Sequence, residues 1–476
     1  MAFARCGPDA GGDIVSMVMS RAAEFRQSRF WWRALPVIAI AAACFALTLR
    51  IFYPGVMTYD AKYIYSYIAA GRAGDWQSPL MTTLWAAIDP IAPGAGSMFL
   101  LIAALYWLGF AVLALTLARR SPWLGVATLL LPLAPPAFVF VGIIWRDALF
   151  AAAWLLAAAL VFAAADKRGV WKTAAQSIAI ALLVFGFLLR PNALFAAPVL
   201  AAYLVWPERF DLKRAAVLYV PAVAALAILQ PVVYYGILDA RHENPLHAIF
   251  VFDLGGITHF VKANQFPVVW TADETALLTT RCYRPTEFDI YWTREPCRFV
   301  MAKLEADKIF GSPALFEAWW RAIMAHPLAY LQHRAALMAN FLINQNLTMW
   351  TVDIADPSRV VFADNRWFMA LKAVHDRLAP TPLFRVGSWL LLCMLWCAVA
   401  WRRRTTASGA FAIGVCGSAV VYIATFFPVG LSSDFRYALW AVLAGFAGAV
   451  VLATREAMPA ATSASSSVAP DTDKSP

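Results

Sequence analysis

Long apolar runs, separated by short polar segments, dominate the chain. A run of about 20 mostly apolar residues is long enough to cross a bilayer as a helix. The runs are continuous rather than alternating, which favours helices over the strands of a barrel. Ten runs are predicted to span the membrane: Ala34–Phe52, Met98–Ala118, Trp123–Trp145, Ala148–Ala165, Thr173–Leu189, Ala193–Trp206, Ala215–Gly236, Val386–Trp401, Ala407–Phe427 and Tyr437–Thr454. The pattern predicts an all-α polytopic membrane protein with about ten transmembrane helices.

The predicted spans divide the chain into five segments. Residues 1–33 form a cytoplasmic segment without the apolar core of a cleavable signal peptide. Residues 34–236 hold seven spans and a long first outer loop at 53–97, and residues 386–454 hold three more spans. Residues 237–385 are predicted to be a mostly helical extracytoplasmic domain. Residues 455–476 are rich in Ala, Ser, Pro and Asp, which predicts a disordered cytoplasmic tail.

Residues 312–347 of the predicted extracytoplasmic domain read as helical, with a second helix starting at Pro327. Its predicted apolar face packs against the domain or the membrane surface and consists of Trp319, Trp320, Leu328, Leu331, Ala335, Leu337 and Phe341. An eleventh span is the alternative. It would place His333 and Arg334 in the middle of a span and move the C-terminus to the outside.

Composition excludes a soluble globular protein. Hydrophobic residues make up 62% and charged residues 14% of the chain, whereas soluble domains average about 45–50% and about 25%. The formal net charge of +10 could indicate nucleic acid or a membrane. Lys and Arg gather in the predicted inner loops, for example at Arg119, Arg120 and 402–404. The excess charge is therefore a topology signal that faces anionic lipid. Nucleic acid is excluded as a partner, and both termini are predicted to lie in the cytoplasm.

Two carboxylates in the first outer loop are candidate catalytic groups. Asp60 and Asp75 could act as general bases next to a membrane-borne substrate. Neighbouring side chains that could contact a sugar or an acceptor are Tyr59, Tyr63, Trp76 and Gln77. The alternative is that the aromatic residues form the usual interfacial belt and the Asp residues cap loops. Two carboxylates without a third ligand do not identify a metal site, so a divalent cation stays open as a cofactor.

Three arginines lie at the predicted outer ends of distant spans. Arg146, Arg190 and Arg436 could together bind a diphosphate or a lipid phosphate, because the planar guanidinium makes bidentate bonds to phosphate. The alternatives are local pairs of Arg146 with Asp147 and of Arg436 with Asp434, or snorkelling of Arg436 to the interface.

Two further features lie in the predicted extracytoplasmic domain. Cys282 and Cys297 are its only cysteines, which favours a disulfide in an oxidising compartment; two free thiols are the alternative. The pair Gly255–Gly256 lacks the Lys and Ser/Thr of a phosphate-binding loop, so a structural turn is predicted there.

These motifs resemble the GT-C superfamily of polytopic membrane glycosyltransferases, and its less-characterised bacterial members most. The resemblance rests on Asp60, the element Asp75-Trp76-Gln77-Ser78-Pro79, Arg146-Asp147, Arg190-Pro191-Asn192, a large outer domain and Arg436-Tyr437. It implies a polyprenyl-phosphate sugar donor, with Asp60 as the base or metal-side carboxylate and Asp75 as the second acidic element. Relatives often have His before Pro where this chain has Gln77-Ser78-Pro79.

The predicted function is transfer of a sugar from a polyprenyl-phosphate donor to a hydroxyl of an extracytoplasmic lipid, glycan or protein. Asp60 would act as the general base, and the three arginines would hold the lipid phosphate. A transporter or lipid flippase is the main alternative, and it predicts ionisable residues midway along spans and an internal repeat. A non-catalytic anchoring protein is a third hypothesis, in which the Asp and Arg residues are structural.

Overall fold

The computed structural model describes residue 32 and residues 34–343, 347–352 and 362–454. Within these ranges every named element is a helix, and extended segments pair only through isolated bridges. The all-α prediction is therefore confirmed for the part of the chain that is described. The predicted N-terminal segment 1–33, apart from residue 32, and the predicted disordered tail 455–476 lie outside the described residues.

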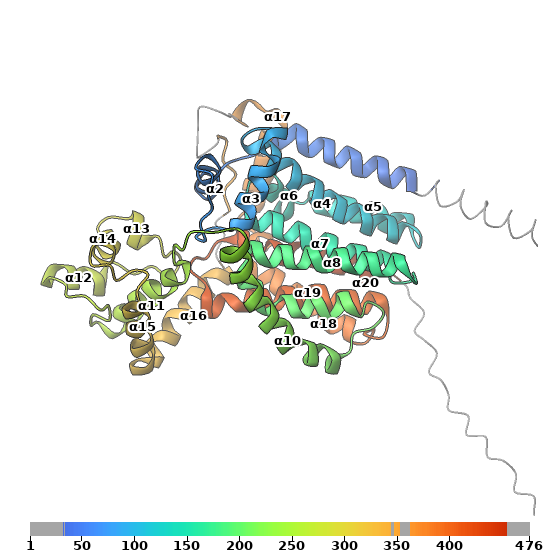
Figure 1. Ribbon diagram of the computed structural model, residues 1–476. Coiled ribbons are helices and arrows are strands. Elements are labelled where there is room, and N and C mark those ends of the chain that lie inside the picture. The colour runs from blue at the N-terminus through green and yellow to red at the C-terminus, as the bar shows by residue number, and fades with distance from the viewer. Residues whose placement is uncertain (1–31, 33, 344–346, 353–361, 455–476) are drawn as a thin grey trace, which may run out of the picture.

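Among the described residues, seven helices are long and apolar enough to cross a membrane. They are Ala34–Phe52, α4 (Ala95–Ala118), α7 (Arg146–Ala164), α8 (Val170–Leu189), α10 with its π-helical extension η4 (Leu212–Pro231 and Val232–Ile237), α19 (Ala407–Val429), and η7 with α20 (Phe435–Ala438 and Leu439–Leu452). Figure 1 shows α4, α7, α8 and α19 running side by side. The chain is thus a helical membrane protein.

Three of the ten predicted spans take a different form, so the count of ten is not confirmed. The third is broken into α5 (Pro122–Leu130), η2 (Leu131–Leu133) and α6 (Pro135–Val141), with a bend of 68°. Proline lacks the N–H that an inner helical turn needs, and Pro132 and Pro135 lie at the break. The sixth is reduced to η3 (Pro191–Phe195) and the 9-residue α9 (Ala197–Val205), and the eighth is the 16-residue α18 (Val386–Trp401).

The bundle has a fully packed centre and an apolar outer surface. Helix α7 contacts α4, α8 and α20 and is buried along most of its length. Helix α10 lies at the periphery, where Val217, Val220 and Ile228 are exposed. A row of exposed branched side chains on a 20-residue helix would be unfavourable in water, so these side chains face lipid.

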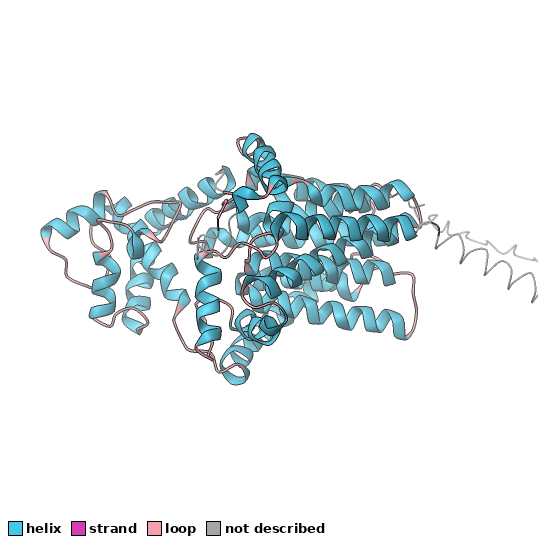
Figure 2. Cartoon of the chain, turned by 90° about the horizontal axis from the view of Figure 1, so that it is seen from above, coloured by secondary structure: helices cyan, strands magenta, loops and turns pink. Residues whose placement is uncertain are grey.

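Six helices form a separate unit at one end of the bundle, which we call the cap (Figures 1 and 2). They are α11 (Pro245–Val261), α12 (Ala272–Thr280), α13 (Ile290–Thr293), α14 (Phe299–Ala306), α15 (Pro313–Ala325) and α16 (Pro327–Ile343). The cap has its own hydrophobic core, and Cys282 and Cys297 form a disulfide within it. The limits of 237–385 for this domain stay a prediction. Within that range, α17 (Arg366–Leu378) packs on the bundle instead, where the Phe368 ring contacts Phe52.

The first loop between membrane helices is also helical. It contains α2 (Tyr59–Ala69), α3 (Pro79–Ile88) and η1 (Asp89–Ile91). Ser78 caps α3 through its side-chain oxygen, which accepts a hydrogen bond from the backbone N–H of Met81. The Ser78 hydroxyl in turn donates to the carbonyl of Leu188, at 2.9 Å. The loop is thereby tied to the end of α8, next to Arg190.

The stretch predicted as an alternative eleventh span forms two helices, α15 and α16, and neither is among the seven long apolar helices. The second helix begins at Pro327 as predicted, but the residues of the predicted apolar face differ in their exposure. Leu328 and Leu331 are exposed, whereas His333 and Arg334 are fully buried. The reason is Asp253 of α11, whose carboxylate lies 2.8 Å from Arg334 and 3.1 Å from His333. A buried counter-ion turns the polar side of α16 inward.

The turn predicted at Gly255–Gly256 was wrong. Both glycines lie inside α11, where Tyr291 and His333 approach so closely that no Cβ would fit. Glycine is needed here for close packing rather than for a turn.

Candidate functional site

The start of α2 lies beside the start of α7 because two extended segments pair. The Val56 N–H donates to the carbonyl of Gly142 at 2.8 Å, and the Ile144 N–H donates to the carbonyl of Val56 at 3.0 Å. The indole N–H of Trp145 then donates to the hydroxyl of Thr58 at 2.9 Å. These bonds bring the first turn of α2, which carries Asp60, next to the first turn of α7.

Asp60 is held by two side chains from other elements. Its Oδ2 lies 2.5 Å from a guanidinium nitrogen of Arg436, and its Oδ1 accepts a hydrogen bond from the Gln77 amide at 3.3 Å. The Asp60 side chain is nevertheless 38% exposed. Burial alone would raise the pKa of Asp60, but the charges of Arg436, Arg146 and Arg190 outweigh it, so the pKa is lowered. Asp60 is therefore a carboxylate anion with an accessible face.

Arg436 connects the first loop to the last membrane helix. Besides Asp60, it pairs with Asp434 at 3.1 Å, which is the local pair considered above. Its guanidinium also lies over the rings of Trp145 and Tyr437, at 4.9 and 5.1 Å from their centroids. Two carboxylates and two aromatic faces fix its position.

Arg190 forms the most buried ion pair of this region. It lies 2.5 Å from Asp147, and the two side chains are 8% and 5% exposed. Asp147 therefore pairs with Arg190 rather than with its neighbour Arg146. The Arg190 guanidinium also lies 4.8 Å from the centroid of the Tyr437 ring, so it shares this ring with Arg436.

Arg146 differs from the other two arginines. Its side chain is half-buried and makes no hydrogen bond or ion pair with any residue in the described ranges. It does interact electrostatically with Asp60, Asp147 and Arg190. A half-buried guanidinium without a direct partner is unusual, because burying its N–H donors without hydrogen-bond partners is costly.

Asp75 belongs to a neighbouring network rather than to the Asp60 cluster. Its two oxygens accept hydrogen bonds from the hydroxyl of Tyr235 at 2.7 Å and from the backbone N–H of Glu243 at 2.6 Å. The Glu243 carboxylate in turn accepts from the hydroxyls of Tyr63 and Tyr67. These bonds join the first loop to η4 and to the segment between η4 and α11.

The predicted contact residues are distributed over both networks. Gln77 bonds Asp60, Tyr63 bonds Glu243, and the backbone N–H of Trp76 donates to Glu243 at 3.0 Å. Tyr59 is 74% exposed. The Trp76 ring contacts Trp292 of the cap, with 6.1 Å between centroids.

Sequence reasoning did not identify Glu243, Trp292 or Asp289. All three lie in the long segment after α10, and the charge of Asp289 interacts with those of Asp60 and Arg436. No local pattern in the sequence marks them, because only the folding of the cap brings them to the first loop.

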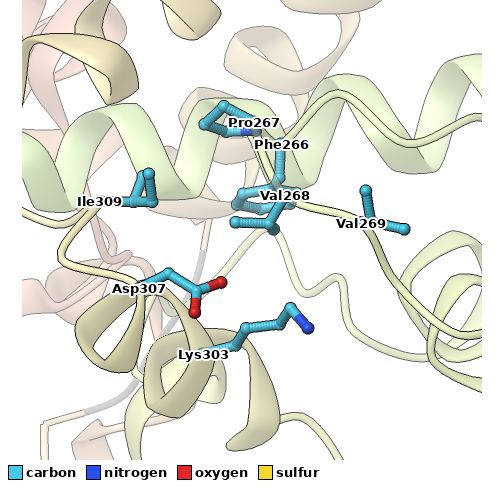
Figure 3. Close-up of a pocket in the computed structure, with 7 residues that line it drawn as sticks. All are labelled: Phe266, Pro267, Val268, Val269, Lys303, Asp307 and Ile309. Carbon is cyan, nitrogen blue, oxygen red and sulfur yellow. The ribbon is translucent and has the colours of Figure 1, made fainter.

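In the described ranges no group of three or more His, Cys, Asp or Glu side chains is arranged to hold a metal ion. A pocket of about 540 Å³ lies elsewhere, in the cap (Figure 3). Figure 3 shows Lys303 and Asp307 on one side of it and the segment 266–269 on the other. None of the candidate site residues lines this pocket.

Comparison of the chain with protein-family models, with curated proteins and with solved structures found no match. The class of the protein therefore rests on its fold, a helical membrane bundle that carries a helical cap and a cluster of charged residues between them.

Proposed function

We propose that the protein is a membrane glycosyltransferase of the GT-C type, which moves a sugar from a polyprenyl-phosphate donor to a hydroxyl of an acceptor. The observation that carries the proposal is the half-buried Arg146, which has no direct partner among the described residues. An anionic ligand would compensate this charge, and the planar guanidinium suits phosphate oxygens. Because Arg146 is the first residue of a membrane-length helix, a phosphate bound there would leave its polyprenyl chain in lipid.

The pairing of Asp60 with Arg436 supports a role for both residues. Asp60 pairs with Arg436 at 2.5 Å and neutralises part of its charge. A donor phosphate would compete for the same guanidinium and release the carboxylate. Asp60 then takes the proton of the acceptor hydroxyl while the oxygen of that hydroxyl forms a bond to the anomeric carbon. The bond from that carbon to the phosphate oxygen breaks, and Arg146 and Arg436 stabilise the departing polyprenyl phosphate.

The remaining candidate residues have positioning roles in this proposal. Arg190 is paired with Asp147 and shapes the phosphate site through Tyr437, which it shares with Arg436. Asp75 holds the first loop against η4 and the segment that follows it. The proposal places the site on the outer face of a bacterial inner membrane, where polyprenyl-linked sugars would meet extracytoplasmic acceptors.

The proposal is tested with full-length protein in liposomes that contain a panel of undecaprenyl-phosphoryl hexoses labelled in the sugar. Release of label to water or to an added acceptor reports transfer. Asp60→Asn should lower turnover by about 10²–10⁴-fold, the usual contribution of a general base. Asp273→Asn, at an exposed position of α12, should leave it unchanged. A folded Asp60→Asn protein with full turnover contradicts the proposal, and lipid movement across the bilayer without release of sugar would favour a flippase.

A further inference from the structure

The segment before α13 is pinned to the loop that precedes Arg436. Glu287 and Ser432 form an antiparallel bridge. The Phe288 N–H donates to the carbonyl of Leu431 at 3.0 Å, and the Ser433 N–H donates to the carbonyl of Thr286 at 2.9 Å. These bonds fix the cap on the bundle beside the charged cluster. They also fix the residue that follows Phe288 in the chain, which is Asp289.

Asp289 is a carboxylate without a direct partner. Its side chain makes no hydrogen bond or ion pair with a residue that the structure describes, and it is exposed. Its charge interacts with those of Asp60 and Glu287, which repel it, and with those of Arg436 and Arg294, which attract it. Both of its oxygens are thus free to accept hydrogen bonds from a ligand at the edge of the Asp60 cluster.

An aromatic wall lies next to Asp289. Trp292 is three residues further along the chain, and Asp289 already has helical backbone angles, so the two side chains share one face of α13. The Trp292 ring contacts Trp76 of the first loop at a tilt of 58°, and both rings are half-buried. The wall is therefore built from the cap on one side and from the first loop on the other.

We propose that Asp289, Trp76 and Trp292 form a subsite that binds a carbohydrate, and that the acceptor of the transfer reaction is a glycan hydroxyl. Half-exposed indole rings offer apolar faces to the C–H side of a sugar ring. An ionised carboxylate accepts hydrogen bonds from two neighbouring hydroxyls. A peptide or a simple lipid alcohol would use only part of this arrangement. The inference rests on the proposed function, because it assigns the acceptor side of the same site.

Binding of simple glycosides tests the inference. Full-length protein is prepared with and without undecaprenyl phosphate and mixed with the methyl glycosides of glucose, mannose, galactose and N-acetylglucosamine, and contacts are detected by saturation-transfer NMR. At least one glycoside should bind. Asp289→Asn and Trp292→Ala should each weaken it by about tenfold, since the first removes a charge-assisted hydrogen bond and the second removes the apolar face under the sugar ring. Trp292→Phe, which preserves an aromatic side chain and the fold, should give a smaller loss.

Matched controls are Asp273→Asn and Trp320→Ala, two exposed positions of the cap away from the wall, and neither should change binding. The inference is overturned if no glycoside binds, or if the folded Asp289 and Trp292 variants bind like the wild type. The binding of undecaprenyl phosphate in the same samples separates the two proposals. If the wild type binds the lipid but no glycoside, only the carbohydrate subsite is overturned. If the wild type does not bind the lipid, the proposed function is overturned.

Discussion

Arg190 and Asp147 link the ends of two membrane helices through an ion pair that is almost completely buried. Removing one partner leaves the other charge uncompensated in a site with little water, which costs about 3–5 kcal/mol. Asp147→Asn should therefore destabilise the full-length protein strongly in thermal unfolding followed in detergent. The surface pair of Lys172 with Glu208, which is 29% and 48% exposed, provides the control. Glu208→Gln should lower the free energy of unfolding by about 1 kcal/mol or less. Equal losses of stability in the two variants would contradict a stabilising ion pair between Arg190 and Asp147.

His333 predicts a pH dependence of stability. Burial lowers the pKa of His333 below its usual 6.5, and the nearby Asp253 compensates only in part. The unfolded chain therefore binds a proton near pH 6.5 that the folded cap does not bind. Stability should be full above about pH 6.5 and fall as the pH drops towards the lowered pKa, by up to about 1.4 kcal/mol per pH unit for each such proton. Burial also lowers the pKa of His247 and His259, which adds to the same trend.

Melting of the full-length protein between pH 7.5 and 5 measures this trend. His333→Gln should reduce its slope without abolishing it, because His247 and His259 remain. An unchanged slope in a folded His333→Gln protein would show that the pKa of His333 is not lowered in the native cap.

At the element scale, α11 and α16 pack so closely that a single methyl group matters. A Cβ at Gly256 would overlap the His333 ring, and overpacking of this kind costs about 1–3 kcal/mol. Gly256→Ala should lower the melting temperature of the full-length protein. Gly236→Ala is the matched control, because a Cβ at Gly236 in η4 meets nothing within 4 Å. A Gly256→Ala protein as stable as the control would contradict the close packing of the two helices.

Elements were predictable from the sequence where hydrophobicity alone determines them. The long spans that became α4, α8 and α19 were found within a few residues. The prolines at 132 and 135 broke the third predicted span, and a count of apolar residues ignores them. The inward side of α16 was missed because Asp253, which neutralises Arg334, lies 81 positions away. The local periodicity of apolar residues carries no information about a counter-ion that is distant in the sequence.

At the scale of the whole molecule, the charged residues divide between the two ends of the bundle. The helices α4, α7 and α18 end at Ala118, Ala164 and Trp401, and these ends lie away from the cap (Figure 1). The basic pairs and clusters at 119–120, 167–168 and 402–404 follow directly. With the usual bias of Lys and Arg towards the cytoplasm, the cap and the candidate site would face the opposite side.

Single-cysteine labelling tests this orientation. A cysteine introduced at exposed Asp273 in the cap should react with a membrane-impermeant maleimide in intact cells. A cysteine at exposed Lys167, next to the opposite end of α7, should react only after the membrane is opened. The reverse pattern would place the candidate site in the cytoplasm and contradict the proposed use of an extracytoplasmic acceptor.

The candidate site could be predicted only in part. Asp60, Arg146, Arg190 and Arg436 were selected as polar residues next to apolar runs, and the structure brings their charges together. Asp289 could not be selected, because it lies in the polar cap segment and reaches the cluster only through the pairing of Phe288 with Leu431. Polar residues at the ends of membrane spans can be recognised in the sequence, because an apolar run adjoins them. Residues of the cap can be assigned to the site only from the tertiary structure.

The affinity of the full-length protein for undecaprenyl phosphate, measured in zwitterionic nanodiscs, tests the central claim most directly. The account predicts that the wild type binds the lipid and that Arg146→Ala lowers the affinity at least about tenfold, because a bond between a guanidinium and phosphate is charge-assisted. Arg321→Ala, at an exposed position of α15, should bind like the wild type. Equal affinity in the Arg146→Ala and Arg321→Ala proteins, or no binding by the wild type, would contradict the claim that this cluster holds a lipid phosphate.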